Sequence, residues 1–368
     1  MKVKILFETK LLRFFLTKKF AWRVFNILIH KPLSAWMFFG LFLNRKKKNN
    51  YFLPLSIDIE PNTKCNLACK FCQVPGWERA KINDMSIQLF EKVLDQFPTL
   101  LIIKLQGMGE PLLNPYLFDM IKMASDRNCL VYTTINGTLL NEGNIKKIVE
   151  SDLIAVTISL DGAKKETFES IRGNANFEKV ISSTKKLLRS RKGKLPEINV
   201  WMVISSDNYQ EIPEMIKLCK DIGVDNLTVQ LEMYSYGKDS IHEKIMEHRI
   251  KEDSNFEAYK RQCTELAKRE KMNFQFHQTS FDKHHPCLWP WTSLYVSAEG
   301  KIVPCCRIGD PDVIHFGSIQ EKRIKEIWNS DEYNQFRNAI KSNRIRSFCR
   351  QCYHRFGSET RGNLIKEG

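Results

Sequence analysis

Cysteines fall into two groups in this sequence, and the first group is compact. Cys65, Cys69 and Cys72 lie within eight residues, directly after an apolar run that predicts a strand. Three thiolates on one strand–helix loop can converge on a single centre, and iron–sulfur clusters normally take four thiolate ligands. A cluster held by three would keep one iron open for a small molecule. The alternatives are free thiols or a zinc site, although zinc prefers paired Cys-x2-Cys knuckles and four ligands.

Further polar residues and glycines follow the ends of the next predicted strands. The sequence Gly-Met-Gly-Glu-Pro at 107–111 follows the second strand, Asn136-Gly137 follows the third, and Ser159 closes the fourth. In an α/β barrel, the C-terminal ends of the strands build the active site. These side chains are therefore expected to lie at one face with the first cysteine group.

The spacing Cys-x3-Cys-x2-Cys, with the 107–111 segment behind it, resembles the radical S-adenosylmethionine (SAM) family over about residues 53–240. The resemblance implies that Cys65, Cys69 and Cys72 bind a [4Fe–4S] cluster whose open iron chelates SAM. One electron then cleaves SAM and releases a 5′-deoxyadenosyl radical. A low-potential donor such as flavodoxin or ferredoxin is the expected source of that electron.

The same resemblance implies a set of SAM contacts. Gly107, Gly109 and Glu110 would hold the SAM ammonium group, and Asn136 would contact the ribose. Ser159 and Arg172 would bind the SAM carboxylate. Strand order alone places Gln230, with Val229, beside the adenine. Asp161, by contrast, can be explained as a turn residue.

Alternating apolar runs and helical stretches predict how these residues are positioned. The expected strands span 55–60, 100–105, 130–135, 153–160, 198–204 and 227–231, and the expected helices lie near 86–97, 116–127, 142–150, 164–191 and 209–222. This order indicates parallel βα units, but about 180 residues are too few for an eight-fold barrel. The predicted fold class is α/β, a partial (β/α)6 TIM-like barrel over 53–240. A helical connector over 241–284 is expected to begin with a capping box of Ser254 and Glu257.

The second cysteine group is dispersed through a short segment, 285–356, which is predicted to be a small α+β domain ahead of a tail at 357–368. Gly300 predicts a hairpin that brings Cys287 near Cys305, and Cys349 and Cys352 follow about forty residues later. Spacing alone allows a four-cysteine zinc site. Cys306 adjoins Cys305, and neighbouring side chains on a strand diverge, so only one of the two readily reaches the site.

This segment resembles the SPASM/Twitch auxiliary-cluster domain of radical SAM enzymes. The resemblance rests on three motifs: the Cys-x(9–15)-Gly-x4-Cys hairpin, the Ile327-Trp328-Asn329 segment and the closing Cys-x2-Cys. Because no cysteine follows Cys352, the segment looks like the shortened Twitch type. The resemblance implies one auxiliary [4Fe–4S] cluster on Cys287, Cys305, Cys349 and Cys352, with Cys305 favoured over Cys306.

The remaining candidates are interpreted as structural. Cys129, Cys219 and Cys263 are isolated and are expected to be small buried apolar residues. His284 and His285 flank the second group and are expected to face solvent rather than bind metal.

The N-terminal extension, residues 1–50, differs from the rest in composition. It has twelve Lys or Arg against one acid, Glu8, so it carries +11 of the net +15 and leaves only +4 for the other 318 residues. Interleaved aromatic and basic residues favour a peripheral contact with an anionic membrane, with helices packed on the barrel as the alternative. Nucleic-acid binding is not expected, and without an export signal the predicted location is cytoplasmic.

The leading functional expectation combines the two clusters. Hydrogen abstraction from a small polyol, sugar or related metabolite, followed by electron transfer to the auxiliary cluster, would make the protein an oxidoreductase. The alternative is a peptide- or protein-modifying maturase that forms thioethers, epimerised residues or formylglycine. A binding protein with two zinc modules is a third, non-catalytic reading.

Overall fold

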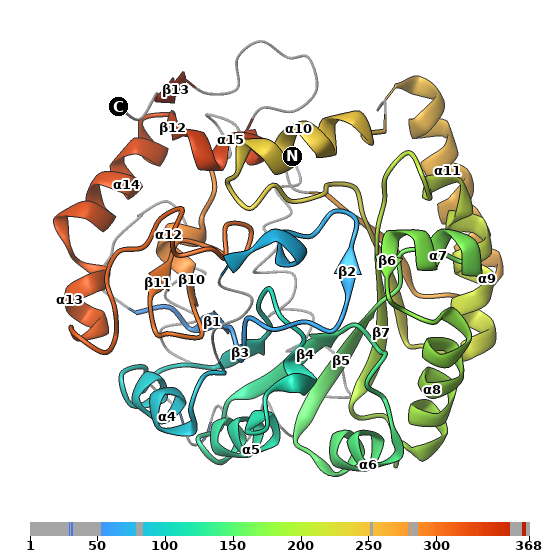
Figure 1. Cartoon of the computed structure of the whole chain (residues 1–368), viewed down its shortest axis with the longest axis horizontal. Coiled ribbons are helices and arrows are strands. Elements are labelled where there is room, and N and C mark those ends of the chain that lie inside the picture. Colours follow the sequence, from blue (N-terminus) through green and yellow to red (C-terminus); the bar gives the residue numbers. More distant parts are fainter. Residues whose placement is uncertain are drawn as a thin grey trace.

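The structure is a computed structural model that describes residues 29, 31, 53–78, 84–250, 253–278, 281, 286–353 and 363–365. A curved sheet forms its centre, and helices surround the outside of that sheet (Figure 1). Apolar strand residues such as Ile57, Ile103 and Val131 are completely buried against this helical layer. Burial of apolar surface on that scale is the main force that holds such a layer in place.

Nine strands make the sheet, in the order β11-β10-β1-β3-β4-β5-β7-β8-β9. All neighbours are parallel except the β10–β11 hairpin. The C-terminal ends of eight strands therefore meet at one edge. The bounds are β1 (Ser56–Ile59), β3 (Ile102–Leu105), β4 (Leu130–Ile135), β5 (Leu153–Ser159), β7 (Glu197–Val203), β8 (Asn226–Gln230), β9 (Phe274–His277), β10 (Ser293–Val296) and β11 (Ile302–Val303).

Helices connect the strands, and several begin at the residue types that favour helix starts. Ser86, Asn141 and Asn176 each accept a backbone N–H of the first turn of α4, α6 and α8. The helices are α4 (Ile87–Asp95), α5 (Leu117–Asp126), α6 (Glu142–Glu150), α7 (Lys165–Ile171), α8 (Phe177–Ser190), α9 (Ile212–Ile222), α10 (Asp239–Glu247), α11 (Ser254–Arg269), α12 (Trp289–Thr292), α13 (Ile324–Trp328), α14 (Asp331–Lys341) and α15 (Arg350–Tyr353).

The structure confirms the six expected strands to within one or two residues of their predicted bounds and adds two more parallel strands. Strand β9 lies within the connector that was predicted to be helical. Strand β10 belongs to the predicted C-terminal hairpin, yet it pairs with β1 in parallel, from Ser56 opposite Ser293 to Ile59 opposite Val296. The C-terminal segment therefore continues the barrel sheet rather than forming a separate layer.

Two local predictions are corrected. The stretch 164–191 is two helices, α7 and α8, because the short strand β6 (Arg172–Gly173) interrupts it. Helix α11 is capped by Asp253, not by Ser254: the Asp253 carboxylate accepts the N–H groups of Asn255 and Phe256. A carboxylate at this position also interacts favourably with the helix dipole.

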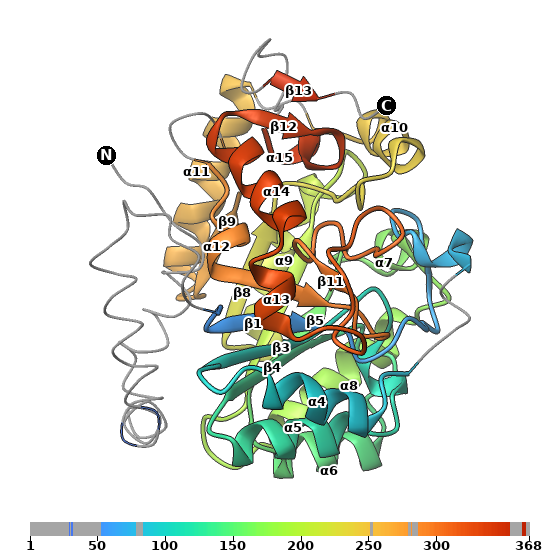
Figure 2. The ribbon, with the colours of Figure 1, turned by 90° about the vertical axis from the view of Figure 1, so that its left-hand side faces the viewer.

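An aromatic cluster fixes α13 and α14 beside the β10–β11 hairpin (Figure 2). Tyr333 stacks on Phe316 with ring centroids 4.2 Å apart and meets Trp328 edge-on at 5.0 Å. The Arg337 guanidinium lies between Trp328 and Tyr333 and donates to the Pro290 carbonyl at 2.7 Å. This cluster is the C-terminal part of the hydrophobic core, which is continuous with the core of the barrel.

The predicted membrane contact of residues 1–50 lies outside the described residues, except for Ile29 and Lys31. The Lys31 ammonium donates to the Leu100 carbonyl at 2.6 Å, next to the start of β3. None of the helices in the described part of the chain is both long and apolar enough to cross a membrane.

Candidate active site

The first cysteine loop is fixed by a strand pair that the sequence did not reveal. Strand β2 (Ala68–Cys69) pairs with β6 in antiparallel fashion, and the Lys70 amide donates to the Ile171 carbonyl at 2.8 Å. A Cβ atom on Gly173 would lie 2.6 Å from the Ala68 carbonyl oxygen, so only glycine permits this approach. The loop orientation is therefore set by the segment after α7.

The three thiols of this loop influence one another. Burial raises the pKa of Cys72 to about 11, and Cys69 and Cys65 are among its electrostatic neighbours. Burial likewise raises the pKa of Cys69, and the nearby Arg172 guanidinium opposes that shift. Such thiols stay protonated until a metal displaces the proton. Grouped soft donors beside a buried cation fit an iron–sulfur cluster, whose thiolates bind different iron atoms.

Among the described residues, no three His, Cys, Asp or Glu side chains form a group suited to a single metal ion.

The 107–111 loop lies against the residues that lead into the cysteine loop. A Cβ on Gly107 would overlap the Glu60 side chain, and one on Gly109 would overlap Asn62 and the Lys64 carbonyl. The backbone also joins the two segments, because the Glu110 amide donates to the Lys64 carbonyl at 2.7 Å. Both glycines are therefore required for close packing of this loop.

Glu110 supports the loop from inside the protein. Its carboxylate accepts the N–H of Leu112 at 3.2 Å, at the start of the short helix η3 (Pro111–Leu113), and the N–H of Asn136 at 2.7 Å. The side chain is only 2% exposed, and burial raises the pKa of Glu110 to about 7. Through these two hydrogen bonds, Glu110 connects the loop after β3 to the end of β4.

Asn136 ties the end of β4 to the cysteine loop. Its side-chain amide donates to the Asn66 side chain at 2.9 Å and lies 3.9 Å from the Cys65 sulfur. Asn66 in turn donates to the Thr138 hydroxyl at 2.8 Å. The predicted ribose contact is therefore a residue that also orients the first cysteine.

Arg172 forms a buried ion pair with Asp161. The Arg172 Nε and one terminal nitrogen both lie 2.6 Å from the same Asp161 oxygen, and the other oxygen accepts the Val203 N–H at 2.8 Å. Burial disfavours the charged guanidinium, but the charges of Asp161 and Cys69 outweigh it and raise the pKa of Arg172. Asp161, which the sequence allowed to be a turn residue, holds Arg172 beside Cys69.

The two other predicted SAM contacts lie at the same edge of the sheet. Ser159 ends β5 opposite Trp201 of β7 and is half-buried. Gln230 ends β8, where it accepts the Trp201 indole N–H at 3.0 Å and the Tyr234 hydroxyl at 3.1 Å. The structure therefore places the predicted SAM contacts near the C-terminal edge of the sheet. Gln230 is hydrogen-bonded there to other side chains of the same chain.

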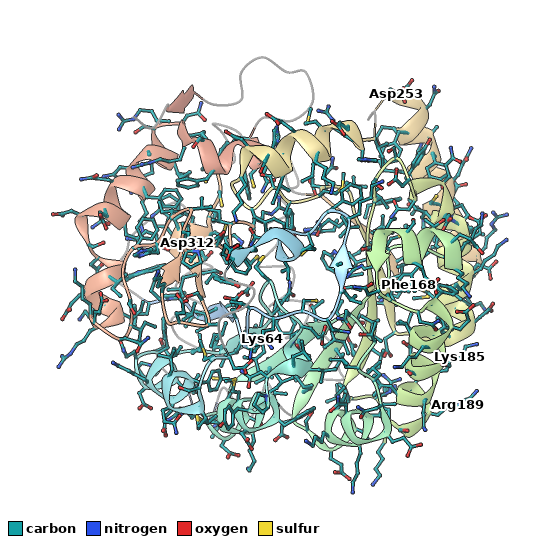
Figure 3. The ribbon with its side chains drawn as sticks, in the orientation of Figure 1. Lys64, Phe168, Lys185, Arg189, Asp253 and Asp312 are labelled. Carbon is teal, nitrogen blue, oxygen red and sulfur yellow. The ribbon has the colours of Figure 1, made fainter. Side chains whose placement is uncertain are left out.

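A different hollow lies between α8 and α9, outside the barrel. Figure 3 shows two of its residues, Lys185 and Arg189, at the outer rim and away from the central loops. It is therefore separate from the site described above.

The second cysteine set comes together from distant segments. The Cys287 amide donates to the Tyr353 hydroxyl at 2.8 Å, and Arg307 donates to the Cys352 sulfur at 3.5 Å. Burial raises the pKa of Cys287 and of Cys305 to about 12, and each has Cys352 as an electrostatic neighbour. Buried thiols near one another and near a guanidinium fit a second cluster of the same chemistry.

Cys306 faces another environment. Its largest electrostatic neighbour is Asp58, ahead of Cys305 and Lys104, although it also influences Cys287. Asp58 and Lys104 belong to one row across the sheet, in which Tyr295, Asp58, Lys104 and Tyr132 stand opposite one another on β10, β1, β3 and β4. We call these four residues the inner row. Cys305 thus has Cys352 and Cys287 as its first electrostatic neighbours, whereas Cys306 has Asp58, and the choice of Cys305 as the ligand stays a prediction.

Two buried tyrosines, which the sequence did not single out, have electrostatic neighbours in the two cysteine sets. Tyr236, with a backbone φ of 54°, has Cys72 and Cys69 as electrostatic neighbours, and burial raises the pKa of its phenol. Tyr234 has Cys306 and Cys352 as neighbours and lies under the Arg307 guanidinium, 4.3 Å from ring to cation. Their position after the predicted strand 227–231 was the available signal.

Cys129, Cys219 and Cys263 are buried, as predicted. His284 and His285 lie outside the described residues.

Comparisons with known proteins agree with this geometry. Residues 59–219 match the radical SAM superfamily, and residues 287–353 match the iron–sulfur cluster-binding SPASM domain. The chain is 27% identical over 325 residues to a tungsten-containing aldehyde ferredoxin oxidoreductase cofactor-modifying protein of Pyrococcus furiosus, covering 80% of this chain and 86% of that protein. It is 24% identical to the PqqA peptide cyclase of Gluconobacter oxydans, covering 77% and 79%.

Solved structures show the same fold. SuiB of Streptococcus suis, bound to its precursor peptide SuiA, superposes with a TM-score of 0.65 at 18% identity over 82% of this chain and 69% of SuiB. The cysteine loop and the strand-end residues up to Arg172 lie within the first matched range, and Cys287, Cys305, Cys349 and Cys352 lie within the second. The chain belongs to the radical SAM superfamily and carries a C-terminal SPASM domain, so that it is an enzyme whose cofactors are [4Fe–4S] clusters and SAM.

Proposed function

We propose that this protein is a radical SAM maturase that oxidatively modifies a peptide or a cofactor precursor. The observation that carries the proposal is that one short segment has electrostatic neighbours in both cysteine sets: Tyr236 has Cys72 and Cys69, and Tyr234 has Cys306 and Cys352. A substrate in this interior would be within reach of both clusters.

The relatives support one class of substrate over the other. The names of the Pyrococcus and Gluconobacter proteins describe a cofactor-modifying protein and a peptide cyclase, and this chain covers most of each. The cysteine pattern alone favoured a polyol or sugar as the substrate. The relatives instead favour the maturase alternative, so we propose a peptide or cofactor precursor in place of a small polyol.

In this proposal, Cys65, Cys69 and Cys72 hold the first cluster, and the 107–111 backbone with Ser159 and Arg172 receives SAM. When bound, this pair of cofactors supplies a radical that removes a hydrogen atom from the substrate. The residues around it position the loop: Asn136 orients Cys65, and Asp161 fixes Arg172 next to Cys69. Glu110 keeps the two strand ends together without contacting solvent.

Cys287, Cys305, Cys349 and Cys352 hold the auxiliary cluster in this proposal. After hydrogen-atom abstraction, the substrate must lose one proton and one electron to become a closed-shell oxidised product. The four-thiolate set is suited to take the electron, because cluster potentials vary widely with their surroundings. Asp58 of the inner row is a buried carboxylate and an electrostatic neighbour of Cys306, so it is a candidate to accept the proton. A flavodoxin or ferredoxin would supply the electron that starts the cycle.

The experiment uses the full chain with both clusters reconstituted without oxygen and reduced by dithionite. Synthetic peptides encoded next to its gene, uniformly deuterated, are compared with myo-inositol deuterated at carbon. We expect a peptide to transfer deuterium into 5′-deoxyadenosine and to become lighter by two hydrogen atoms. Deuterium transfer from the inositol and from none of the peptides would overturn the proposed substrate class.

A further inference from the structure

Glu60 follows β1 and is completely buried, and each of its two carboxylate oxygens accepts a different backbone N–H. One oxygen accepts the Met108 amide at 2.9 Å, in the middle of the 107–111 loop. The other accepts the Ala298 amide at 3.1 Å, in the turn between β10 and β11. One side chain thus joins the loop assigned to SAM and the hairpin that leads to Cys305.

A second contact joins the same two parts. The Met108 side chain lies against Gly309, where a Cβ atom would overlap the Met108 methyl group. The Gly309 amide donates to the Cys305 carbonyl at 3.1 Å, so this contact lies one turn from an auxiliary-cluster cysteine. Gly107, which precedes Met108 in the chain, has no room for a side chain because the Glu60 side chain packs directly against its backbone.

The two hydrogen bonds of Glu60 favour a rigid connection between the 107–111 loop and the hairpin. Hydrogen bonds to a charged acceptor are stronger than those between neutral groups, and a carboxylate that loses a donor is destabilised more in the interior than at the surface. Burial beside the Glu60 carboxylate raises the pKa of Tyr295, which keeps that phenol protonated on the same side. If the loop and the hairpin moved independently, the buried Glu60 carboxylate would therefore lose one of these two N–H donors.

We propose that Glu60 is a positioning residue that couples SAM binding to the auxiliary-cluster segment through the amides of Met108 and Ala298. SAM binding at the 107–111 loop then changes the surroundings of the auxiliary cluster, and loss of the hairpin contact weakens SAM binding. Coupling of two sites in this way is reciprocal by thermodynamic necessity. The inference rests on the proposed assignment of the two sites and is independent of the substrate class.

The turn that carries Ala298 offers a selective test. Ser297 and Gly300 close the turn through a 2.8 Å hydrogen bond, so Ala298 holds its second position, where proline is favoured. Ala298→Pro removes the N–H that reaches Glu60, because proline has no backbone donor, and it places the proline ring against the same carboxylate. Ala298→Gly keeps that N–H and is the matched control. Glu60→Gln tests the same hydrogen bond by changing its acceptor.

The measurements use holoprotein with its iron content verified: equilibrium dialysis of SAM, and the reduction potential of the auxiliary cluster with and without SAM. We expect Ala298→Pro and Glu60→Gln to weaken SAM binding about tenfold, the loss expected for one charged hydrogen bond. Both should abolish the SAM-dependent shift in potential, whereas Ala298→Gly keeps it. Unchanged SAM affinity and an unchanged shift in Ala298→Pro would overturn the coupling. Wild-type protein that binds no SAM would instead overturn the site assignment on which the coupling rests.

Discussion

The two cysteine sets are held by different physical means. The first set lies on one loop, and hydrogen bonds from β6, Asn136 and the Asp161–Arg172 pair fix it to the strand ends. The second set joins segments from Cys287 to Cys352, and the aromatic cluster of α13 and α14 supports it. The first depends on local polar contacts, whereas the second depends on packing of a whole segment. Substitutions that remove the ligands or the packing of one set should therefore leave the cluster of the other set in place, whereas substitutions at the Glu60 link should affect both regions.

The largest expected effect comes from removing a first-set ligand. In Cys72→Ala, SAM cleavage should fall to background and the iron content should drop from about eight to about four atoms per chain. Iron and sulfide analysis with a 5′-deoxyadenosine assay checks this. Cys129→Ala is the matched control, because Cys129 is buried just before β4, at the edge of the sheet opposite to the strand ends that hold the first set. Cleavage that survives in Cys72→Ala would remove this loop from the active site.

Substitutions in the second set should distinguish the adjacent residues Cys305 and Cys306. Cys305→Ala should lose the auxiliary cluster, leaving about four irons, while SAM cleavage continues at the first set. Cys306→Ala should retain about eight irons, because Asp58 and Lys104 are prominent among its neighbours. Iron analysis and electron paramagnetic resonance distinguish the variants. The reverse pattern would assign the ligand to Cys306.

Packing of the second region should respond to Arg337→Met. The substitution leaves the Pro290 and Trp328 carbonyls without their buried donor, and we expect a loss of about 3 kcal/mol in the free energy of unfolding. Urea unfolding measures this, and Lys325→Met, at an exposed position of α13, is the control. Auxiliary iron should fall while first-cluster iron stays. Equal loss from both sets would mean that the regions are not independent.

The smallest effect is expected from Asn66→Ala at the exposed edge of the first loop. It removes hydrogen bonds to Thr138 and from Asn136, so SAM affinity should fall a few-fold, equivalent to about 1 kcal/mol. Asn66→Asp keeps the acceptor and loses the donor, and should give an intermediate value. Isothermal titration of the reconstituted protein with SAM provides the measurement. An unchanged affinity in both variants would show that the cluster alone fixes this loop.

The sequence was most informative where a signal is local. Cys65, Cys69 and Cys72 stand within one loop, and the period of apolar residues located six strands. It was least informative where the partner is distant in the chain. Strand β10 joins β1, and Arg172-Gly173 forms a strand only because Ala68–Cys69 lies beside it. Side-chain roles were also out of reach: nothing near Glu110 in the sequence indicates that its carboxylate binds the Asn136 amide.

The parallel pairing of β1 with β10 has a consequence for biosynthesis. Ser56 leaves the ribosome long before Ser293, so the nascent chain exposes one edge of β1 while most of the barrel already exists. An unpaired strand edge is prone to association with other chains, and pairings so far apart in sequence form slowly. A gene shortened before β10 would keep that edge open permanently. We therefore expect the C-terminal segment to be indispensable for solubility, even in a chain that never receives iron.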